Sequence, residues 1–272
     1  MTKFENYLIF AHYHSDGLIR KDLQNFFKKN KSIFREIVFI STNLKKSEKI
    51  KISQRIKIIN RENIGYDFYS YKIGSEYFLK KFKGNLQNKK FFFINSSVLF
   101  VNSDKLIKII KSIKIKENQM WGLTKSYELA EHVQSYFFCF SATVFQNKNI
   151  SDWWSKIKTL TKRQDIINNY ELGLSDLMIK NNIKLYSIYK KNLRLKSKNF
   201  IQKIKQRYRE VVLKETKIYK KNPTNYFWED IYSKFGIIKI ELIKKNPNKI
   251  DIKKLKIIFK KNRNLKIDAF NN

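Results

Sequence analysis

The sequence contains a single cysteine and two prolines, and it has no apolar run long enough to cross a membrane. One cysteine, Cys139, excludes an internal disulfide and a zinc site built from several cysteines, so we expect a reducing compartment, with the cytoplasm as the default. The polar amino terminus leads into an apolar run of strand length, too short for a signal peptide. No internal repeat and no Gly/Ser-rich linker divides the 272 residues, a length that allows one large domain or a domain with an appendage.

Acidic residues are also scarce: 23 of them stand against 58 lysines and arginines, for a net charge of +35. Such an excess invites a nucleic-acid-binding hypothesis, because Lys and Arg that neutralise phosphates supply most non-specific affinity. However, the basic residues are mostly Lys, are spread along the chain and occur with abundant Asn and Ile, as coding bias in an AT-rich genome would produce. We therefore expect no specific nucleic acid. An anionic membrane surface is the favoured partner, since it attracts each nearby Lys or Arg by about 1 kcal/mol.

The sequence does contain 42% hydrophobic residues, which is enough for a sizeable core. Continuous apolar runs of strand length alternate with segments in which apolar residues recur at helical spacing. The expected strands are 7–11, 36–43, 56–59, 91–94, 120–124, 132–140 and 185–189. One helix is expected after residue 17, and three others over 66–82, about 104–113 and 166–179. Alternating strands and helices imply an α/β three-layer sandwich with a mostly parallel central sheet and right-handed crossovers.

Short polar residues indicate where two of these helices begin. Ser15 or Asp16 is expected to cap the first helix, and Ser103 or Asp104 the helix near 104–113, because their side chains can accept from free backbone N–H groups. Glycine inside a helix costs about 1 kcal/mol relative to alanine. Gly173 therefore indicates either close packing or the start of a helix.

The stretch 61–72 joins a short apolar strand to a helix through a polar turn with one glycine, Gly65. In open α/β sheets, ligands bind outside the carboxyl ends of strands, where helix N-termini present free N–H groups to anions such as a nucleotide diphosphate. We therefore expect Asn63, Gly65 and Asp67 to line a donor pocket, with Arg61 paired to the diphosphate. The alternative is an ordinary strand-to-helix connection, in which Gly65 supplies backbone freedom and Asp67 complements the helix dipole.

Six short motifs follow one another along the chain. They are Arg61-x-Asn63-x-Gly65-x-Asp67, Asn95-x-Ser97-Val98, Trp121-Gly122-Leu123-Thr124, His132-x-Gln134-Ser135-Tyr136-Phe137, Tyr170-Glu171-x-Gly173-Leu174-Ser175 and Asn222-Pro223-Thr224-x-x-x-Trp228. With these motifs the chain, from residue 7 to about residue 247, resembles the rhamnan synthesis protein F family. The resemblance implies a glycosyltransferase of bacterial surface polysaccharides, many members transferring rhamnose from a nucleotide sugar, and a GT-A-like nucleotide-binding fold.

Two positions depart from the family pattern. The family usually reads Asn-Asp-Ser after the fourth strand, and here Ser96 stands where the acid is expected. If that acid resembles the metal-binding carboxylate of other GT-A enzymes, a bound Mg²⁺ or Mn²⁺ is doubtful, since Mg²⁺ usually needs one or two carboxylates plus substrate phosphates. Asp104 is the next acid along, and Lys or Arg could instead neutralise the leaving diphosphate. His14 replaces an acid expected after His-Tyr, which weakens a role for that loop in binding the base or ribose.

The resemblance also implies a set of site residues, with any metal ligands unknown. The donor-binding set is His12, Arg61, Asn63, Gly65, Asp67, Asn95, Ser96 and Ser97, and the acceptor-binding set is Trp121, Gln134 and Tyr136. A base must take the proton from the acceptor hydroxyl, and the candidates are Glu171, His132 and Glu131. Glu171 ranks first, because it precedes Gly173 much as the catalytic acid of inverting GT-A enzymes precedes its helix.

These expectations combine into one functional hypothesis. A domain of residues 1–190 would transfer rhamnose or a similar sugar, with inversion, from a nucleotide-sugar donor to a glycan or lipid-linked glycan of an O-antigen, capsule or rhamnan. Residues 191–272 would form a basic, mainly helical extension that packs on this domain and holds the protein against the inner face of the cell membrane. Two alternatives remain: a catalytically inactive scaffold of a polysaccharide assembly complex, and a basic nucleic-acid-binding protein.

Overall fold

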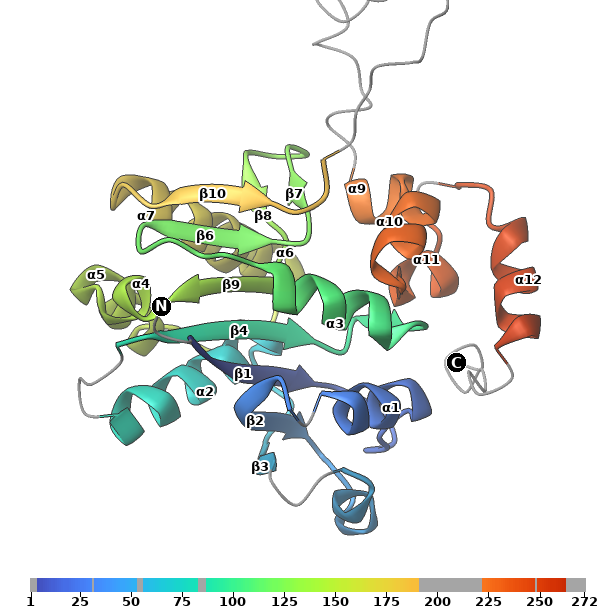
Figure 1. The fold of residues 1–272 in the computed structure, drawn as a ribbon, viewed down its shortest axis with the longest axis horizontal. Coiled ribbons are helices and arrows are strands. Elements are labelled where there is room, and N and C mark those ends of the chain that lie inside the picture. The colour runs from blue at the N-terminus through green and yellow to red at the C-terminus, as the bar shows by residue number, and fades with distance from the viewer. Residues whose placement is uncertain are drawn as a thin grey trace, which may run out of the picture.

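A seven-stranded sheet forms the centre of the molecule, in the order β10-β6-β9-β4-β1-β2-β3 (Figure 1). The structure is a computed structural model, and it describes residues 4–30, 32–52, 56–82, 87–190, 222–247 and 249–262. The strands of this sheet are β1 (Glu5–His12), β2 (Phe34–Thr42), β3 (Ile56–Arg61), β4 (Lys89–Asn95), β6 (Gln119–Gly122), β9 (Phe137–Ser141) and β10 (Lys184–Ser187). The sheet is mostly parallel, because only β9 runs antiparallel to its neighbours β4 and β6.

The strand order reverses at β1. From β1 the chain adds β2 and then β3 on one side, and it returns to add β4 on the other side. The carboxyl ends of β1 to β4 therefore lie at one edge of the sheet, where Ala11 of β1 is paired with Asn95 of β4. In open α/β sheets such a topological switch point is the place where ligands bind.

Helices cover both faces of the sheet, as the alternation of side chains along β1 requires. Leu8 and Phe10 face one core with α1 (Lys21–Lys29) and α3 (Ser103–Ser112). Tyr7 and Ile9 face the other core with α2 (Tyr66–Phe82) and α5 (Lys148–Ser155). The remaining helices on that side are α4 (Ala142–Gln146), α6 (Arg163–Ile166), the π-helix η2 (Ile167–Leu172) and α7 (Gly173–Lys180). The expected three-layer α/β sandwich is confirmed.

The segment 222–262 brings a second, small sheet to the carboxyl edge of the main one. Its elements are α9 (Pro223–Tyr226), α10 (Trp228–Phe235), β11 (Ile237–Lys239), α11 (Ile240–Lys244) and α12 (Lys253–Lys261). Strand β11 pairs antiparallel with β5 (Val98–Phe100), which follows β4 closely in the chain. Gly236 makes the turn from α10 into β11 with φ +69°, and a Cβ there would lie 2.3 Å from the carbonyl oxygen of Asn102. A third apolar cluster, which includes Leu99 and Trp228, holds this segment in place.

Both predicted helix caps are wrong. Helix α1 begins after Arg20, with no side-chain cap, because residues 13–20 form an irregular turn that separates Ser15 and Asp16 from the helix. The N-cap of α3 is Asn102, whose side chain accepts from the backbone N–H of Lys105. The prediction that Gly173 marks close packing or a helix start is wrong: Gly173 lies inside a continuous helix at the change from η2 to α7, and a Cβ there would have its nearest neighbour at 3.8 Å.

The expected strand 132–140 is divided into two. Residues His132–Val133 form β8, which pairs with β7 (Lys125–Ser126), and β9 begins only at Phe137. At the break, the side chain of Gln134 donates to Asn222 and the backbone N–H of Ser135 donates to Glu171, and neither residue is part of β8 or β9. The two short strands therefore form a hairpin beside the main sheet.

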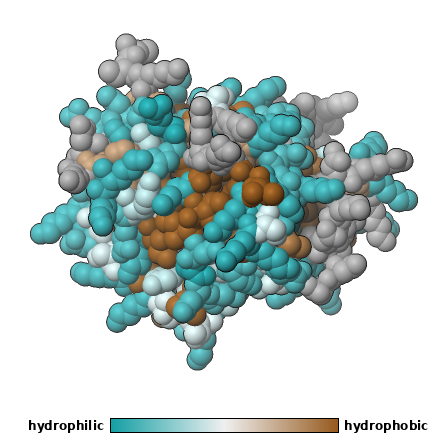
Figure 2. All heavy atoms as spheres, turned by 90° about the horizontal axis from the view of Figure 1, so that it is seen from below, coloured by the Kyte–Doolittle hydropathy of each residue, from teal (hydrophilic) through white to brown (hydrophobic). Residues whose placement is uncertain are grey.

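The outer strand β3 and the 3₁₀ helix η1 (Lys46–Lys51) lie on the lower side of Figure 1. Figure 2 shows this side, with an apolar area surrounded by hydrophilic atoms. On β3 the side chains of Ile58 and Ile59 are half-buried, while Lys57 is exposed, and a charged residue on an edge strand opposes pairing with another chain. None of the helices in the described ranges is both long and apolar enough to span a bilayer.

Candidate active site

Asn95, the last residue of β4, is the centre of a polar cluster at the switch point. Its Nδ2 donates to Oδ2 of Asp67, 2.8 Å away in the first turn of α2. Its Oδ1 accepts from the hydroxyl of Ser97 at 2.6 Å and from the backbone N–H of the same residue at 3.0 Å. The apolar side chains of β4 are buried, so the strand delivers this one amide to the carboxyl edge of the sheet. Three of the predicted donor-binding residues are therefore in direct contact.

Lys239 completes the cluster from the carboxyl-terminal segment. Its ammonium group donates to Oγ of Ser97 at 3.0 Å and lies 5.0 Å from the centre of the Tyr136 ring. It reaches this position because β11 pairs with β5, which sets Lys239 opposite Val98. A chain of hydrogen bonds thus runs from the lysine through Ser97 and Asn95 to the carboxylate of Asp67.

Glu171 adds a second carboxylate whose charge acts on the same lysine. It lies on the π-helix η2, a rare element that occurs frequently at functional sites. Its Oε1 accepts from the backbone N–H of Ser135 at 2.7 Å, and the carbonyl oxygen of Ser135 accepts from the hydroxyl of Tyr71 at 2.8 Å. The turn that leads into β9 therefore connects Glu171 to α2, and hence to the element that carries Asp67.

Burial dominates the electrostatics of this cluster. It raises the pKa of Asp67 to about 6; the cations Lys239 and Arg61 oppose the shift and Glu171 adds to it. Burial lowers the pKa of Lys239, and the negative charges of Glu171, Glu241 and Asp67 oppose that shift. Groups with desolvated charges and specific charged partners are typical of functional sites.

Arg61 organises the loop that precedes α2. Its Nη1 donates to the carbonyl oxygens of Glu62, at 2.7 Å, and Ile64, while Nη2 donates to that of Tyr66 at 2.5 Å. Its Nε donates to Oγ of Ser70 at 2.9 Å. The guanidinium therefore holds the turn in shape from inside the loop. The expected pairing of Arg61 with a diphosphate stays a prediction.

The backbone of this loop is left-handed at two successive residues, Gly65 with φ +71° and Tyr66 with φ +51°. A Cβ at Gly65 would lie 2.8 Å from Cβ of Tyr69, so a side chain has no room there. Asn63 is exposed on the same loop. Both the conformation and the close approach explain the glycine, whether or not the loop binds a donor.

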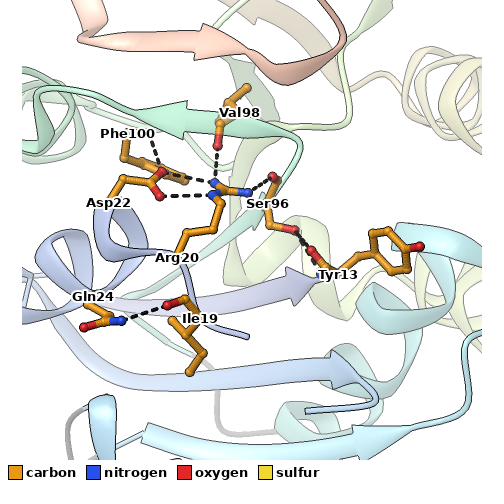
Figure 3. Close-up of polar contacts among 8 residues, drawn as sticks. All are labelled: Tyr13, Ile19, Arg20, Asp22, Gln24, Ser96, Val98 and Phe100. Atoms are coloured by element: carbon orange, nitrogen blue, oxygen red, sulfur yellow. Dashed lines mark hydrogen bonds and ion pairs between the residues drawn. The ribbon is translucent and has the colours of Figure 1, made fainter. Parts of the chain in front are cut away.

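A buried ion pair behind the cluster holds the turn after β4 (Figure 3). Arg20 contacts Asp22 at 3.0 Å, and its guanidinium also donates to the carbonyl oxygens of Ser96 and Val98, both at 2.8 Å. Oδ2 of Asp22 accepts from the backbone N–H of Phe100 at 2.9 Å. These contacts fix the segment 96–100 from both of its sides. Because Ser97 lies within that segment, Arg20 and Asp22 position it against Asn95 and Lys239.

Two other predicted donor residues are buried near this turn. Oγ of Ser96 accepts from the backbone N–H of Tyr13 at 2.9 Å and donates to its carbonyl oxygen at 3.3 Å, so it ties β4 to the loop after β1. His12 ends β1 with Nδ1 2.8 Å from Oγ of Ser41. Burial, and then the positive charge of Arg20, lower the pKa of His12 to about 3, which makes the ring neutral at physiological pH.

Gln134 and Tyr136, the predicted acceptor residues on the lead-in to β9, contact the carboxyl-terminal segment. Oε1 of Gln134 accepts from the hydroxyls of Thr124 at 2.7 Å and Thr224 at 2.5 Å, and its Nε2 donates to Oδ1 of Asn222 at 3.1 Å. The hydroxyl of Tyr136 lies 2.8 Å from that of Thr124. Three of the six sequence motifs therefore meet in one buried polar network, which docks the segment that carries Lys239.

The other predicted residues lie on β6 of the main sheet and on the hairpin of β7 and β8. Trp121 stacks on Tyr186 of β10 with 5.0 Å between ring centres. Glu131 is exposed and forms an ion pair with Lys125. His132 is buried, with Nδ1 2.8 Å from the backbone carbonyl oxygen two residues earlier. Of the three candidate bases, Glu171 is the one whose charge acts on Lys239 and Asp67.

Sequence reasoning missed Lys239, Arg20 and Asp22. Lysines are so abundant in this chain that no single one is conspicuous, and Lys239 becomes special only through the pairing of β11 with β5. Arg20 and Asp22 are two residues apart, a spacing that carries no recognisable motif.

Residues 37–254, most of the chain, match the rhamnan synthesis protein F family. The chain belongs to this family. The family assignment made from the order of the sequence motifs is thus confirmed. The match includes Asp67, Asn95, Ser97, Glu171 and Lys239, so the whole polar cluster lies within the part that this family shares.

Two bacterial relatives are similar over part of their length. The uncharacterized protein y4gN of Sinorhizobium fredii (strain NBRC 101917 / NGR234) is 29% identical over 123 residues, which are 43% of this chain and 31% of y4gN. The virulence protein VirA of Vibrio anguillarum (strain ATCC 68554 / 775) is 28% identical over 203 residues, which are 70% of this chain and 62% of VirA. The chain therefore spans less than two thirds of the length of either relative.

Among solved structures, the glycosyltransferase GlyE of Streptococcus pneumoniae TIGR4 is similar in fold. The similarity covers 98% of this chain and 62% of GlyE, with a TM-score of 0.50 and 11% sequence identity. At that identity the likeness concerns the fold alone. Together with the topology of the sheet, it confirms the expected GT-A-like α/β architecture.

Proposed function

We propose that this member of the rhamnan synthesis protein F family is a glycosyltransferase that moves a sugar from a nucleotide-sugar donor to a bacterial surface polysaccharide. One observation carries the proposal: at the switch point of the sheet Asn95 and Ser97 link Asp67 to Lys239, and the charge of Glu171 acts on both of these residues. Carboxylates can accept protons, and they can accept hydrogen bonds from hydroxyl groups. An ammonium group can bind a phosphate. The cluster therefore contains a group suited to each part of the transfer reaction: removing the proton of the acceptor, binding the donor and binding the diphosphate.

The reaction that fits this cluster is a direct displacement at the anomeric carbon of the donor. The acceptor hydroxyl oxygen forms the new bond to that carbon while the bond to the diphosphate oxygen breaks. Glu171 takes the proton of the hydroxyl, and the electron pair of the broken bond leaves with the diphosphate. Attack from the face opposite the leaving group inverts the anomeric centre. Glu171 is preferred as the base because it lies on the half of the chain that follows the aromatic strands, with its carboxylate held by Ser135.

Asp67 and Asn95 are assigned to the donor. The carboxylate of Asp67 lies at the N-terminus of α2 and next to the left-handed turn at Gly65, where an α/β sheet binds nucleotides. It would accept from hydroxyl groups of the ribose or of the sugar, with Asn95 fixing its orientation. We propose rhamnose or a similar hexose as the sugar. The acceptor would be a growing glycan, free or lipid-linked, at the inner face of the cell membrane.

A thermal-shift screen with dTDP-, UDP- and GDP-sugars tests the donor class. A ligand that binds only the native state raises its stability, by about 2.7 kcal/mol at a hundred times its dissociation constant. We expect one nucleotide class to raise the melting temperature and to be consumed when an acceptor glycan is added. NMR of the product then gives its anomeric configuration, which should be opposite to that of the donor.

Other outcomes point to the alternative functions. Binding of a nucleotide sugar without transfer or hydrolysis would indicate a catalytically inactive scaffold. Binding of DNA or RNA with a steep salt dependence, and no preference among nucleotide sugars, would indicate a nucleic-acid-binding protein. A product with the anomeric configuration of the donor would refute the displacement by Glu171 while leaving the transferase activity intact.

A further inference from the structure

The residues around Lys239 form a poor site for a divalent cation. Mg²⁺ requires oxygen ligands in near-octahedral geometry and usually takes one or two carboxylates. Here the turn after β4 offers the amide of Asn95 and the hydroxyl of Ser97, and both are already hydrogen-bonded to each other. The ammonium group of Lys239 lies 3.0 Å from that hydroxyl. A metal ion at this hydroxyl would be repelled by a positive charge at hydrogen-bonding distance.

The remaining acids do not supply an alternative metal site. No group of three or more His, Cys, Asp or Glu side chains suited to a metal ion occurs within the described ranges. Asp104, the next acid after the turn, lies on α3 and forms an exposed ion pair with Lys29 at 2.5 Å. Oδ2 of Asp67 already accepts from Asn95. The acids left for a metal ion are therefore Asp67 and Glu171, and the ammonium group of Lys239 interacts with both of their charges and makes the cluster a poor fit for Mg²⁺ or Mn²⁺.

We propose that Lys239 is the cation that binds and neutralises the diphosphate of the nucleotide during transfer, in place of a divalent metal ion. This role depends on the transfer reaction proposed above and names the residue that stabilises its leaving group. When the bond between the anomeric carbon and the diphosphate oxygen breaks, the electron pair remains on that oxygen. The ammonium group donates a hydrogen bond to the oxygen at the same moment, which is the electrostatic stabilisation that a metal would otherwise provide.

The contacts of Lys239 fit a phosphate ligand better than a structural salt bridge. An ammonium group has three N–H donors, and the hydroxyl of Ser97 accepts one of them. The ring of Tyr136 lies below the ammonium and gives a further attraction that uses no donor. The residue as a whole is half-buried, and burial of its ammonium group lowers the pKa. It is therefore held in a fixed place with donors to spare for a diphosphate.

The carboxylates of the cluster favour the charged form of the lysine, against the larger effect of burial, which lowers its pKa. Burial alone would favour a neutral amine, and the charges of Glu171 and Asp67 oppose that effect. Glu241 acts in the same sense, while its partner Arg163, 2.8 Å away, acts in the opposite sense. Within this cluster the ammonium group beside Ser97 is the group that can attract a diphosphate.

Metal dependence is the first test. The purified full chain is treated with EDTA, and transfer from the nucleotide sugar found in the screen is measured with and without added Mg²⁺ or Mn²⁺. We expect the same rate in all three conditions. Loss of transfer in EDTA with recovery in Mn²⁺ would overturn the role of Lys239 while the proposed transferase function stands. Absence of nucleotide-sugar binding in every condition would instead refute the function itself.

Substitution of the lysine is the second test, with binding of the free nucleotide as its readout. Isothermal titration with the matching nucleoside diphosphate, in EDTA, should show affinity lower by about ten- to a hundredfold in Lys239→Met, which keeps the apolar stem of the side chain. Affinity for the nucleoside alone should stay unchanged, because a nucleoside has no phosphate for Lys239 to bind. Lys239→Arg should recover part of the diphosphate affinity, since it restores the charge.

A matched control separates local from general charge effects. Lys244→Met removes the same charge from an exposed position in the same segment, and it should leave both affinities unchanged. A purely structural role of Lys239 would lower nucleoside and nucleoside diphosphate affinity together, along with the melting temperature. That result, or equal diphosphate affinity in Lys239→Met and the unchanged protein, would contradict the proposal.

Discussion

At the scale of single residues, the buried position of Asp67 disfavours the charged form of its carboxyl group. Burial raises its pKa from 3.8 to about 6, more than Lys239 and Arg61 lower it. Between about pH 4 and pH 6 the native state therefore binds more protons than the unfolded state does. The free energy of unfolding falls as the pH rises through this window, and the loss persists at higher pH. The protein thus gives up stability at neutral pH to keep a desolvated carboxylate in the site.

Asp67→Asn should remove this cost. We expect the variant to have a higher free energy of unfolding than the unchanged protein at pH 7, by about 1–3 kcal/mol from the size of the shift. The difference should disappear below about pH 4, where Asp67 is neutral in both states. Urea unfolding at several pH values measures it. A variant that is less stable at pH 7 would contradict the sign of the argument, and unchanged donor affinity would contradict the assignment of Asp67 to the donor.

Glu171→Gln tests the assignment of the base. The change keeps size and hydrogen bonding, including the acceptor for Ser135, but removes the ability to take a proton. Base catalysis contributes about a hundred- to ten-thousandfold, so kcat should fall by about that factor with donor affinity near that of the unchanged protein. Glu131→Gln is the control, since Glu131 is exposed and paired with Lys125. If Glu131→Gln or His132→Ala abolishes turnover and Glu171→Gln retains it, the base has been misassigned.

The sequence could predict the parts of the site that follow from strand ends and motifs. Asp67, Asn95 and Ser97 each come directly after a buried strand or at the first turn of a helix, and the structure brings them into contact. Lys239 could not be predicted in this way. Its place depends on the pairing of two strands that lie far apart in the sequence, and that pairing depends on tertiary packing rather than on local pattern.

At the scale of elements, the turn between β4 and β5 depends on the buried pair of Arg20 and Asp22. Their side chains are only 13% and 3% exposed, so each charge needs the other. Arg20→Ala leaves Asp22 buried without its cation and frees the carbonyl oxygens of Ser96 and Val98. We expect a loss of about 3–5 kcal/mol in the free energy of unfolding, the usual cost of breaking a buried pair.

An exposed arginine gives the matched control for this prediction. Arg35 lies 3.9 Å from Glu5 and is 73% exposed, so Arg35→Ala should change stability by no more than about 0.5 kcal/mol. Chemical unfolding of both variants at neutral pH measures the two values. Similar small losses in both would show that the Arg20 pair does not hold the turn. A large loss in Arg20→Ala should also weaken nucleotide binding, because the turn positions Ser97 next to Lys239.

The order of the main elements was predictable because the buried strands are continuous apolar runs. The helix expected over 66–82 matches α2, whose apolar residues recur at helical spacing. The short elements were not predictable: β5, β7 and β11 have two or three residues each, too few for a period to show. The caps failed for a related reason, since Ser15 and Asp16 look like caps in sequence while the helix begins after Arg20.

At the scale of the whole molecule, the net charge of +35 predicts attraction to anionic membranes. The basic extension expected over 190–261 lies partly outside the described residues. Within them, α12 has exposed lysines at 253, 254, 260 and 261, while Leu255 and Phe259 are buried against the third apolar cluster. We expect the protein to co-sediment with vesicles that contain phosphatidylserine and to be released by high salt. Binding to neutral vesicles, or binding that high salt leaves undiminished, would count against reversible electrostatic attachment.

A pair of charge reversals locates the surface responsible. Lys260→Glu with Lys261→Glu changes the charge of α12, and Lys45→Glu with Lys46→Glu makes the same change near η1. If α12 faces the membrane, the first pair should weaken co-sedimentation and the second should not. Equal weakening by both pairs would mean that the total charge alone determines the attachment, as expected of a composition set by coding bias.

The pairing of β11 with β5 has a consequence for the order in which the protein is made. A nascent chain that has emerged from the ribosome as far as β10 already contains every strand of the main sheet, together with Asp67, Asn95 and Glu171. The lysine that completes the cluster has not yet been translated at that point. An unfinished polypeptide would thus hold two carboxylates without their cation, and these repel a diphosphate. Synthesis itself would delay nucleotide capture until the small second sheet has formed.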